Sequence, residues 1–342
     1  MVGRCNPVGS RLRSGHEQAL PRKKPSAVTS EEMQGRYRFR RTEPSYEIDM
    51  TSPTRAEMRA LGCTEATIAY LFVNPKTESI LRHPEDWFWI DKKWWKTASK
   101  EVVRNLHEIC GGCFGDLSLE DQCALLDIPL TTIPGRKLPD GKCVWQLPSG
   151  AKVNIENFAL DVIRKPGEQG MACEGTAAAS LHMIVGRQFN DMHGHDIAFD
   201  ETRQRPFQPG KAHADKVMAA LHVVLNNPKE VYLRHRGYLD GLMYRPFVTV
   251  MEYLDLVGDS YFERTFRHRY ETGAGTFGGC PDLTLRGISL RFVEVKGTDK
   301  LHGNQAMWIR DCAKPLGLDV SVVRVMPEGE YVDYLEAQRK RS

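Results

Sequence analysis

Residues 279–296, with the sequence GCPDLTLRGISLRFVEVK, predict a β-hairpin around which the rest of the chain is organised. The segments 282–286 and 290–296 are rich in Leu, Val and Phe, a composition typical of strands. Between them lies the short segment 287–289, Gly-Ile-Ser, whose composition favours a turn. We therefore expect two antiparallel strands joined by a three-residue loop.

The register of this hairpin decides which side chains meet. If Arg286 pairs with Leu290 across the loop, counting back along both strands places Asp282 opposite Glu294. Side chains alternate along a strand, so Glu294 and Lys296 share one face with Asp282. The other face is then expected to point to the core and carries Leu283, Leu285, Val293 and Val295.

Two carboxylates directly across a strand pair lie about 4.5–5.5 Å apart at Cβ and repel each other unless a positive charge lies between them. Carboxylate oxygens suit a hard cation such as Mg²⁺ or Mn²⁺. A neighbouring Lys adds a positive charge, or a general base if its pKa is depressed. Such a group can hydrolyse a phosphodiester, because the metal polarises the phosphoryl oxygen and lowers the pKa of an attacking water. The alternative is a surface hairpin whose acids and lysine only form salt bridges.

The order of residues in and after the hairpin resembles the signature of the PD-(D/E)XK nucleases. Pro281-Asp282 is followed, after eleven residues, by Glu294-Val295-Lys296. The continuation resembles the VRR-NUC branch of that superfamily, and consists of GTDKL at 297–301, Gln305, Trp308 and VSVVRV at 320–325. Further upstream, Cys173-Glu174-Gly175 at the start of a predicted helix is similar to the Fanconi-associated nuclease family.

The resemblance implies an α/β fold of the restriction-endonuclease-like type, a mixed sheet flanked by helices. It also implies a metal-dependent, structure-selective DNA endo- or exonuclease that cuts flaps, branches or ends in DNA repair. Mg²⁺ or Mn²⁺ would be held by Glu174, Asp282, Glu294 and the Val295 carbonyl, with Lys296 beside the attacking water. Stand-alone VRR-NUC proteins imply an alternative, a Holliday-junction resolvase-like dimer.

Glu174 and Gln305 both lie on predicted helices. Helical spacing places Glu174 on one stripe with Ala177, Ala178 and Leu181, so it faces inward and needs a partner. The alternative is a carboxylate that only complements the helix N-terminal dipole. Gln305 lies on the apolar stripe of the helix predicted over 301–316, where its amide can hydrogen-bond a metal-bound water or the Lys296 amine. The alternative is that Gln305 is a polar side chain at the helix edge that only has its own hydrogen bonds satisfied.

Arginines near the hairpin in sequence are candidates for contact with backbone phosphate. We expect Arg267 and Arg269 first, and the further candidates are Arg264, Arg234 and Arg236. The alternative is a solvated helix face. A function of another class is a non-catalytic DNA-binding module, and a nuclease that acts on RNA is a third possibility.

The remainder of the chain divides by composition. Residues 1–45 are expected to form a basic, disordered arm, since residues 1–41 hold ten Lys or Arg against three acids, a balance of +7. Residues 46–150 are expected to form a mixed or mainly helical N-terminal domain, and residues 151–342 the nuclease domain. No apolar run reaches the length of a membrane span. Nine scattered cysteines favour a reducing compartment, which is the cytoplasm or nucleoid in a bacterium and the nucleus in a eukaryote.

Two further clusters leave alternatives open. Residues 86–96 contain four of the six tryptophans. These side chains could form a platform on which unpaired bases stack. We favour the alternative, in which they are apolar residues that fill a core. The spacing of His107, Cys110 and Cys113, with Cys123 further on, resembles zinc ligation. Because Cys123 lies in an apolar run, we expect it to face the core instead. The expected partner is branched or flapped DNA, bound by a monomer or a homodimer.

Overall fold

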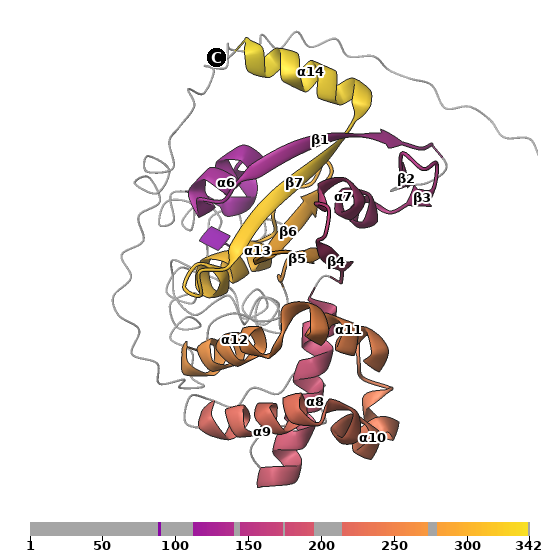
Figure 1. The fold of residues 1–342 in the computed structure, drawn as a ribbon. Helices are drawn as coiled ribbons and strands as arrows, with labels where there is room; N and C mark the ends of the chain where they lie inside the picture. Colours follow the sequence, from indigo (N-terminus) through magenta and orange to yellow (C-terminus); the bar gives the residue numbers. More distant parts are fainter. Residues whose placement is uncertain are drawn as a thin grey trace, which may run out of the picture.

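A mixed sheet of seven strands occupies the centre of the part of the chain that the structure describes, in the order β3-β2-β1-β7-β6-β5-β4 (Figure 1). The structure is a computed structural model and describes residues 88–89, 112–139, 144–173, 175–194, 214–272 and 279–340. The strands are β1 (Leu130–Lys137), β2 (Trp145–Gln146), β3 (Lys152–Val153), β4 (Gln169–Ala172), β5 (Leu283–Arg286), β6 (Leu290–Lys296) and β7 (Asp319–Pro327).

The hairpin β5–β6 has the register that the sequence predicts. Arg286 pairs with Leu290, and Leu283 pairs with Val293. The next positions beyond Leu283 and Val293, Asp282 and Glu294, therefore lie opposite each other. β6 runs parallel to β7, and β7 runs parallel to β1. The other neighbouring strands are antiparallel.

Helices cover both faces of the sheet, which confirms the predicted α/β arrangement and is consistent with a restriction-endonuclease-like fold. The mainly helical N-terminal region of that prediction lies largely outside the described residues. The helical elements are η3 (Phe114–Asp116), α6 (Leu119–Leu126), α7 (Ile155–Ile163), α8 (Thr176–His193), α9 (Ala214–Asn226), α10 (Pro228–Leu239), α11 (Phe247–Val257), α12 (Asp259–Thr272), α13 (Gly303–Trp308), the π-helical turn η6 (Ile309–Ala313) and α14 (Glu328–Arg339).

The two faces of the hairpin enter two different cores. Leu283, Leu285, Val293 and Val295 pack with Phe158 of α7, as the predicted alternation requires. The opposite face contributes Phe292 to a larger core that includes residues of α8, α9, α11 and α12. Figure 1 shows these helices gathered on one side of the sheet, while α14 lies against β1 and β7. Both faces of β6 are therefore buried.

Local sequence signals explain several of these elements. Ser118 and Asn154 cap α6 and α7, because their side-chain oxygens accept hydrogen bonds from the backbone N–H groups three residues on. The helix predicted over 301–316 starts at Gly303 and widens at Ile309 into a π-helical turn, where the Lys314 N–H bonds to the Ile309 carbonyl.

Two strands do not follow from the sequence. β1 contains Pro134 and Gly135, which favour a loop. It is nevertheless paired on both sides, and a Cβ at Gly135 would lie 2.7 Å from the Phe158 ring. β4 is a short strand at the end of the sheet order and contains Gly170. Because β1 to β3 belong to the same sheet as β7, the boundary predicted near residue 150 falls inside this sheet.

None of the helices in the described part of the chain is long and apolar enough to span a membrane.

A buried histidine links α8 to α12. His182 is 2% exposed, its ring Nε2 is hydrogen-bonded to the Tyr270 hydroxyl, and burial holds its pKa well below the ordinary value near 6.5. The nearby Arg269 charge lowers the pKa further. The His182 imidazole is therefore neutral in the folded state, whereas the same imidazole takes up a proton in the unfolded chain.

We expect the free energy of unfolding to fall as the pH drops below about 6.5, since the unfolded state then binds one proton more than the folded state. The slope from this one residue approaches about 1.4 kcal/mol per pH unit. His182→Gln, which keeps a hydrogen-bonding group for Tyr270, should show a slope shallower by that amount. Urea unfolding of both proteins between about pH 5 and pH 7 measures it, and equal slopes would contradict the assignment.

Candidate active site

Asp282, Glu294 and Lys296, the predicted acidic site, lie at the open end of the hairpin, opposite its turn. Asp282 directly precedes β5, and its Oδ2 accepts a hydrogen bond from the Val295 N–H at 2.8 Å. Glu294 and Lys296 are the fifth and seventh residues of β6 and lie on the face that meets the larger core. The Asp282 side chain is thus held by the backbone of the strand that carries the other two residues.

Glu294 and Lys296 form a buried ion pair. The Lys296 Nζ lies 2.8 Å from the Glu294 Oε1, and the side chains are 7% and 1% exposed for Lys296 and Glu294 respectively. Gln305 joins them, because its Nε2 donates to the same Glu294 oxygen and its Oε1 accepts from the Lys296 Nζ at 3.1 Å. The interpretation of Gln305 as pointing toward the sheet is therefore confirmed in its geometry.

Gln305 is itself fixed by the start of α13. The His302 N–H donates to the Gln305 Oε1 at 2.8 Å, and the His302 side chain accepts from the Gln305 N–H, a reciprocal capping box. His302 is not among the residues predicted from the sequence, although a capping residue three positions before a Gln is a recognisable pattern. The helix start also approaches the hairpin closely, since a Cβ at Gly279 would lie 2.2 Å from the Asn304 carbonyl oxygen. Gly279 has a φ of 106°, which only glycine adopts readily.

The second oxygen of Glu294 has no hydrogen-bond partner in the described part of the chain. Among the described residues, no group donates a hydrogen bond to the buried Glu294 Oε2. Burial, and after it the negative charge of Asp282, raise the pKa of the Glu294 carboxyl to about 8, against the opposing effect of Lys296. A buried acceptor without a donor is rare in proteins and calls for an explanation by a missing ligand or cation.

The structure does not test the predicted metal site. Glu174 lies outside the described residues. Its neighbours are described: the Cys173 N–H donates to the Asp282 carbonyl at 3.0 Å, and Gly175 precedes α8 as its N-cap. Among the residues that the structure describes, no three His, Cys, Asp or Glu side chains form a metal-binding group. Metal binding by Glu174, Asp282, Glu294 and the Val295 carbonyl thus stays a prediction.

The predicted phosphate-binding arginines lie on α10 and α12, and most are engaged within the chain. Arg267 pairs with Glu271 at 3.2 Å, and the other contacts are Arg234 to Glu230 at 3.0 Å, Arg236 to Asp240 at 3.1 Å, and Arg269 over the Tyr270 ring at 5.8 Å. A guanidinium already paired with a carboxylate gives up part of that interaction when it binds phosphate, so the sequence clusters alone do not define a DNA surface.

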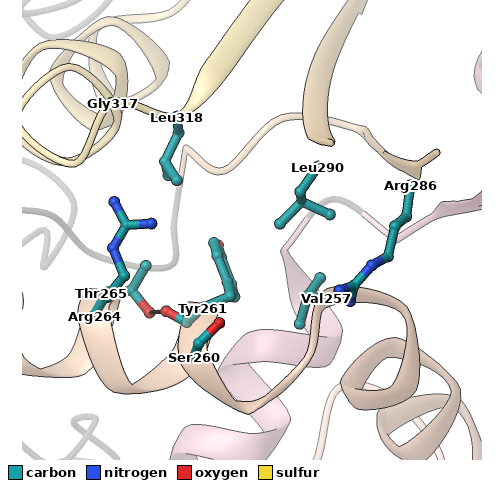
Figure 2. Close-up of a pocket in the computed structure, with 9 residues that line it drawn as sticks. All are labelled: Val257, Ser260, Tyr261, Arg264, Thr265, Arg286, Leu290, Gly317 and Leu318. Atoms are coloured by element: carbon teal, nitrogen blue, oxygen red, sulfur yellow. Dashed lines mark hydrogen bonds between the residues drawn. The ribbon is translucent and has the colours of Figure 1, made fainter. Parts of the chain in front are cut away.

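Arg264 lines a cavity at the turn end of the hairpin, shown in Figure 2. The cavity has a volume of about 220 Å³, and Arg286 lies at its other side. Arg264 donates to the Leu316 carbonyl. The four strand residues between the turn and Asp282 span about 13 Å, so this cavity is separate from the acidic group.

The tryptophan and cysteine clusters are described only in part. Trp89 is 5% exposed and packs on Phe114 with ring centroids 5.1 Å apart, which confirms the core interpretation for this residue. The other tryptophans of residues 86–96 lie outside the described residues. His107 and Cys110 also lie outside them, whereas Cys113 and Cys123 are buried. Cys123 faces the core as expected, and burial raises the pKa of its thiol to about 12.

Comparison with known proteins gives one kind of match. No protein-family model matches the chain, and no curated protein matches it. Among solved structures, the chain is similar to crystal structures of paFAN1 bound to 5′-flap DNA with a gap. With the 2-nucleotide flap the identity is 20% and the TM-score 0.39, over 67% of this chain and 43% of that chain. With the 1-nucleotide flap the identity is 18% and the TM-score 0.40, over 68% of this chain and 45% of that chain. This chain spans less than half the length of those proteins.

The raised pKa of Glu294 predicts a stability change that is specific to the metal-free protein. Between about pH 4.5 and pH 8 the folded state holds a proton that the unfolded chain has released, so stability falls as the pH rises through this window. Glu294→Gln removes the ionisable group while keeping its shape. In EDTA, we expect this variant to melt at a higher temperature than wild type near pH 8, and at a similar temperature near pH 5.

The same exchange at the exposed Glu336 on α14 controls for the loss of a carboxylate. Melting temperatures that differ equally at both pH values would show that the Glu294 carboxyl is not the titrating group.

Proposed function

We propose that this chain is a metal-dependent, structure-selective deoxyribonuclease that hydrolyses phosphodiester bonds at flaps, branches or ends of DNA. The observation that carries the proposal is the buried Glu294 carboxyl group, one oxygen of which receives no hydrogen bond from the residues that the structure describes and whose pKa the charge of Asp282 helps to raise. A protein of this size could fill the position with an apolar residue at lower cost, because burying a carboxylate is unfavourable. A site that binds a cation gives this carboxylate a function.

The residues fit a divalent cation by their chemistry. Glu294 Oε2 is a hard oxygen with no hydrogen bond from the described residues, and Asp282 adds a second carboxylate from the paired strand. Mg²⁺ and Mn²⁺ prefer such ligands. Asp282, Glu294, the Val295 carbonyl and Glu174 would hold the ion, which would supply a Lewis acid that polarises the phosphoryl group and lowers the pKa of a water.

In this proposal Lys296 acts on the substrate. An ammonium has three N–H donors, and the described partners of Lys296 are the Glu294 Oε1 and the Gln305 Oε1. The third donor remains for a phosphoryl oxygen or for the attacking water. Because the pair is buried, a positive charge here stabilises developing negative charge more strongly than it would in water.

Gln305 keeps this lysine in position. Its oxygen accepts from both the Lys296 Nζ and the His302 N–H, while its nitrogen donates to Glu294. The amide therefore fixes the relative positions of the lysine and the carboxylate. Preference for flaps, branches or ends rests on the motif resemblance of about residues 278–326. Because paFAN1 was crystallised with 5′-flap DNA, that substrate is the first to test.

The direct test is cleavage of labelled 5′-flap, four-way-junction and plain duplex DNA with Mn²⁺ or with EDTA. We expect wild type to cut only with the metal, and Asp282→Asn and Glu294→Gln to lose about 10²–10³-fold or more in rate, since each removes a charge that holds the metal. Both variants should still bind DNA. Asp319→Asn, on an exposed position at the start of β7, is the matched control and should cut like wild type.

Lys296→Ala separates the roles within the site. We expect it to slow cleavage by a larger factor than it changes the Mn²⁺ concentration needed for half-maximal rate, because the lysine does not hold the metal. Preferred cutting of four-way junctions would favour the resolvase-like dimer. Metal-independent DNA binding without cleavage of any substrate would refute the nuclease and favour a non-catalytic binding module.

A further inference from the structure

Arg245 is held in place by two hydrogen bonds to the start of α8. It lies in the segment between α10 and α11 and is partly exposed. Its backbone N–H donates to the Ser180 Oγ at 3.1 Å, and its side-chain Nε donates to the Thr176 Oγ1 at 2.8 Å. Both ends of the residue are thus anchored to one helix, which restricts where its guanidinium can point.

A short series of hydrogen bonds leads from this guanidinium to the acidic site. The Thr176 hydroxyl and the Thr176 N–H both donate to the Cys173 carbonyl, the latter at 2.8 Å. The Cys173 N–H donates in turn to the Asp282 carbonyl at 3.0 Å. The three peptide units from residue 173 to residue 176 span at most about 11 Å. This length corresponds to roughly three nucleotides of rise along one DNA strand.

None of the residues that the structure describes neutralises the charge of Arg245. No carboxylate in the described part of the chain lies within ion-pair distance of its side chain, and the hydrogen bond that this side chain makes there uses Nε. A guanidinium has five N–H donors, so the two terminal nitrogens retain four. Three of the five arginines predicted from the sequence differ in this respect, since Arg267, Arg234 and Arg236 each pair with an acid of this chain.

We propose that Arg245 contacts a backbone phosphate of the DNA strand bound at the acidic site, an inference that rests on the proposed function. A planar guanidinium with two free nitrogens suits bidentate contact with phosphate oxygens. Thr176 acts as its positioning residue, because the hydroxyl orients the guanidinium through Nε and leaves the terminal nitrogens for the ligand. The competing role is a purely structural one, in which Arg245 only fastens the α10–α11 segment to α8.

Charge separates the two roles. Binding of a fluorescent 5′-flap duplex is measured by anisotropy in EDTA at several salt concentrations for wild type, Arg245→Gln and Arg245→Lys. We expect Arg245→Gln to weaken binding about fivefold or more and to reduce the slope of log K against log salt by about 0.9, the value for one lost phosphate contact. Arg245→Lys should keep the slope, because the charge remains.

Two further variants keep the result unambiguous. Thr176→Val removes the hydroxyl and leaves the charge, so we expect weaker binding with an unchanged slope. Arg164→Gln removes an exposed charge next to α7, on the opposite face of the sheet, and should bind like wild type. Melting temperatures check that each variant is folded.

An unchanged salt slope in folded Arg245→Gln, or equal losses in Arg245→Gln and Arg245→Lys, would overturn the proposal, and so would a wild type that does not bind DNA. Binding that depends on Arg245 in a protein that cuts no DNA would refute the nuclease function while supporting this contact.

Discussion

Burial of the Glu294 carboxylate on the helix-covered face of the sheet is the constraint on which the site depends. The side chain is 1% exposed, and Lys296 and Gln305 both direct their donors at its Oε1. Removing a charge from water costs several kcal/mol, which one ion pair in the interior offsets only with good geometry and further hydrogen bonds. The pKa of the carboxyl is raised because the described residues do not fully offset this cost of burying its charge. A cation at Oε2 would lower this pKa and complete the set of partners.

The surrounding elements keep these partners in register. The tight hairpin turn fixes which residues of β5 and β6 face each other, and the Val295 N–H then orients Asp282. On the other side, the close approach at Gly279 and the capping box of His302 set where α13 begins, and hence where Gln305 reaches the ion pair. Immediately after α13, the π-helical turn buries Ile309, Cys312 and Ala313 against the rest of the larger core. The polar group is therefore bounded by rigid, packed structure.

The sequence could predict those parts of the fold that depend on local spacing. Register follows from loop length and strand alternation, which is why the pairing of Arg286 with Leu290 and the inward direction of Gln305 are correct. β1 could not be predicted, because its Pro and Gly disfavour a strand and only pairing with β7 and packing on Phe158 decide its structure. The pair of Arg267 with Glu271 follows from their i,i+4 spacing on one helix and could have been predicted. The anchoring of Arg245 by Thr176 depends on a tertiary contact, which local spacing does not encode.

The central claim is that Asp282 and Glu294 hold a divalent cation. Anomalous diffraction from crystals grown with Mn²⁺ tests it most directly, since the metal scatters anomalously at a wavelength where the anomalous scattering of carbon, nitrogen and oxygen is negligible. The account predicts an anomalous peak within about 2.0–2.6 Å of oxygens of both carboxylates, and its absence in Glu294→Gln crystals grown in the same way. Wild-type crystals with no peak at these carboxylates, while Lys296 still pairs with Glu294, would contradict the account.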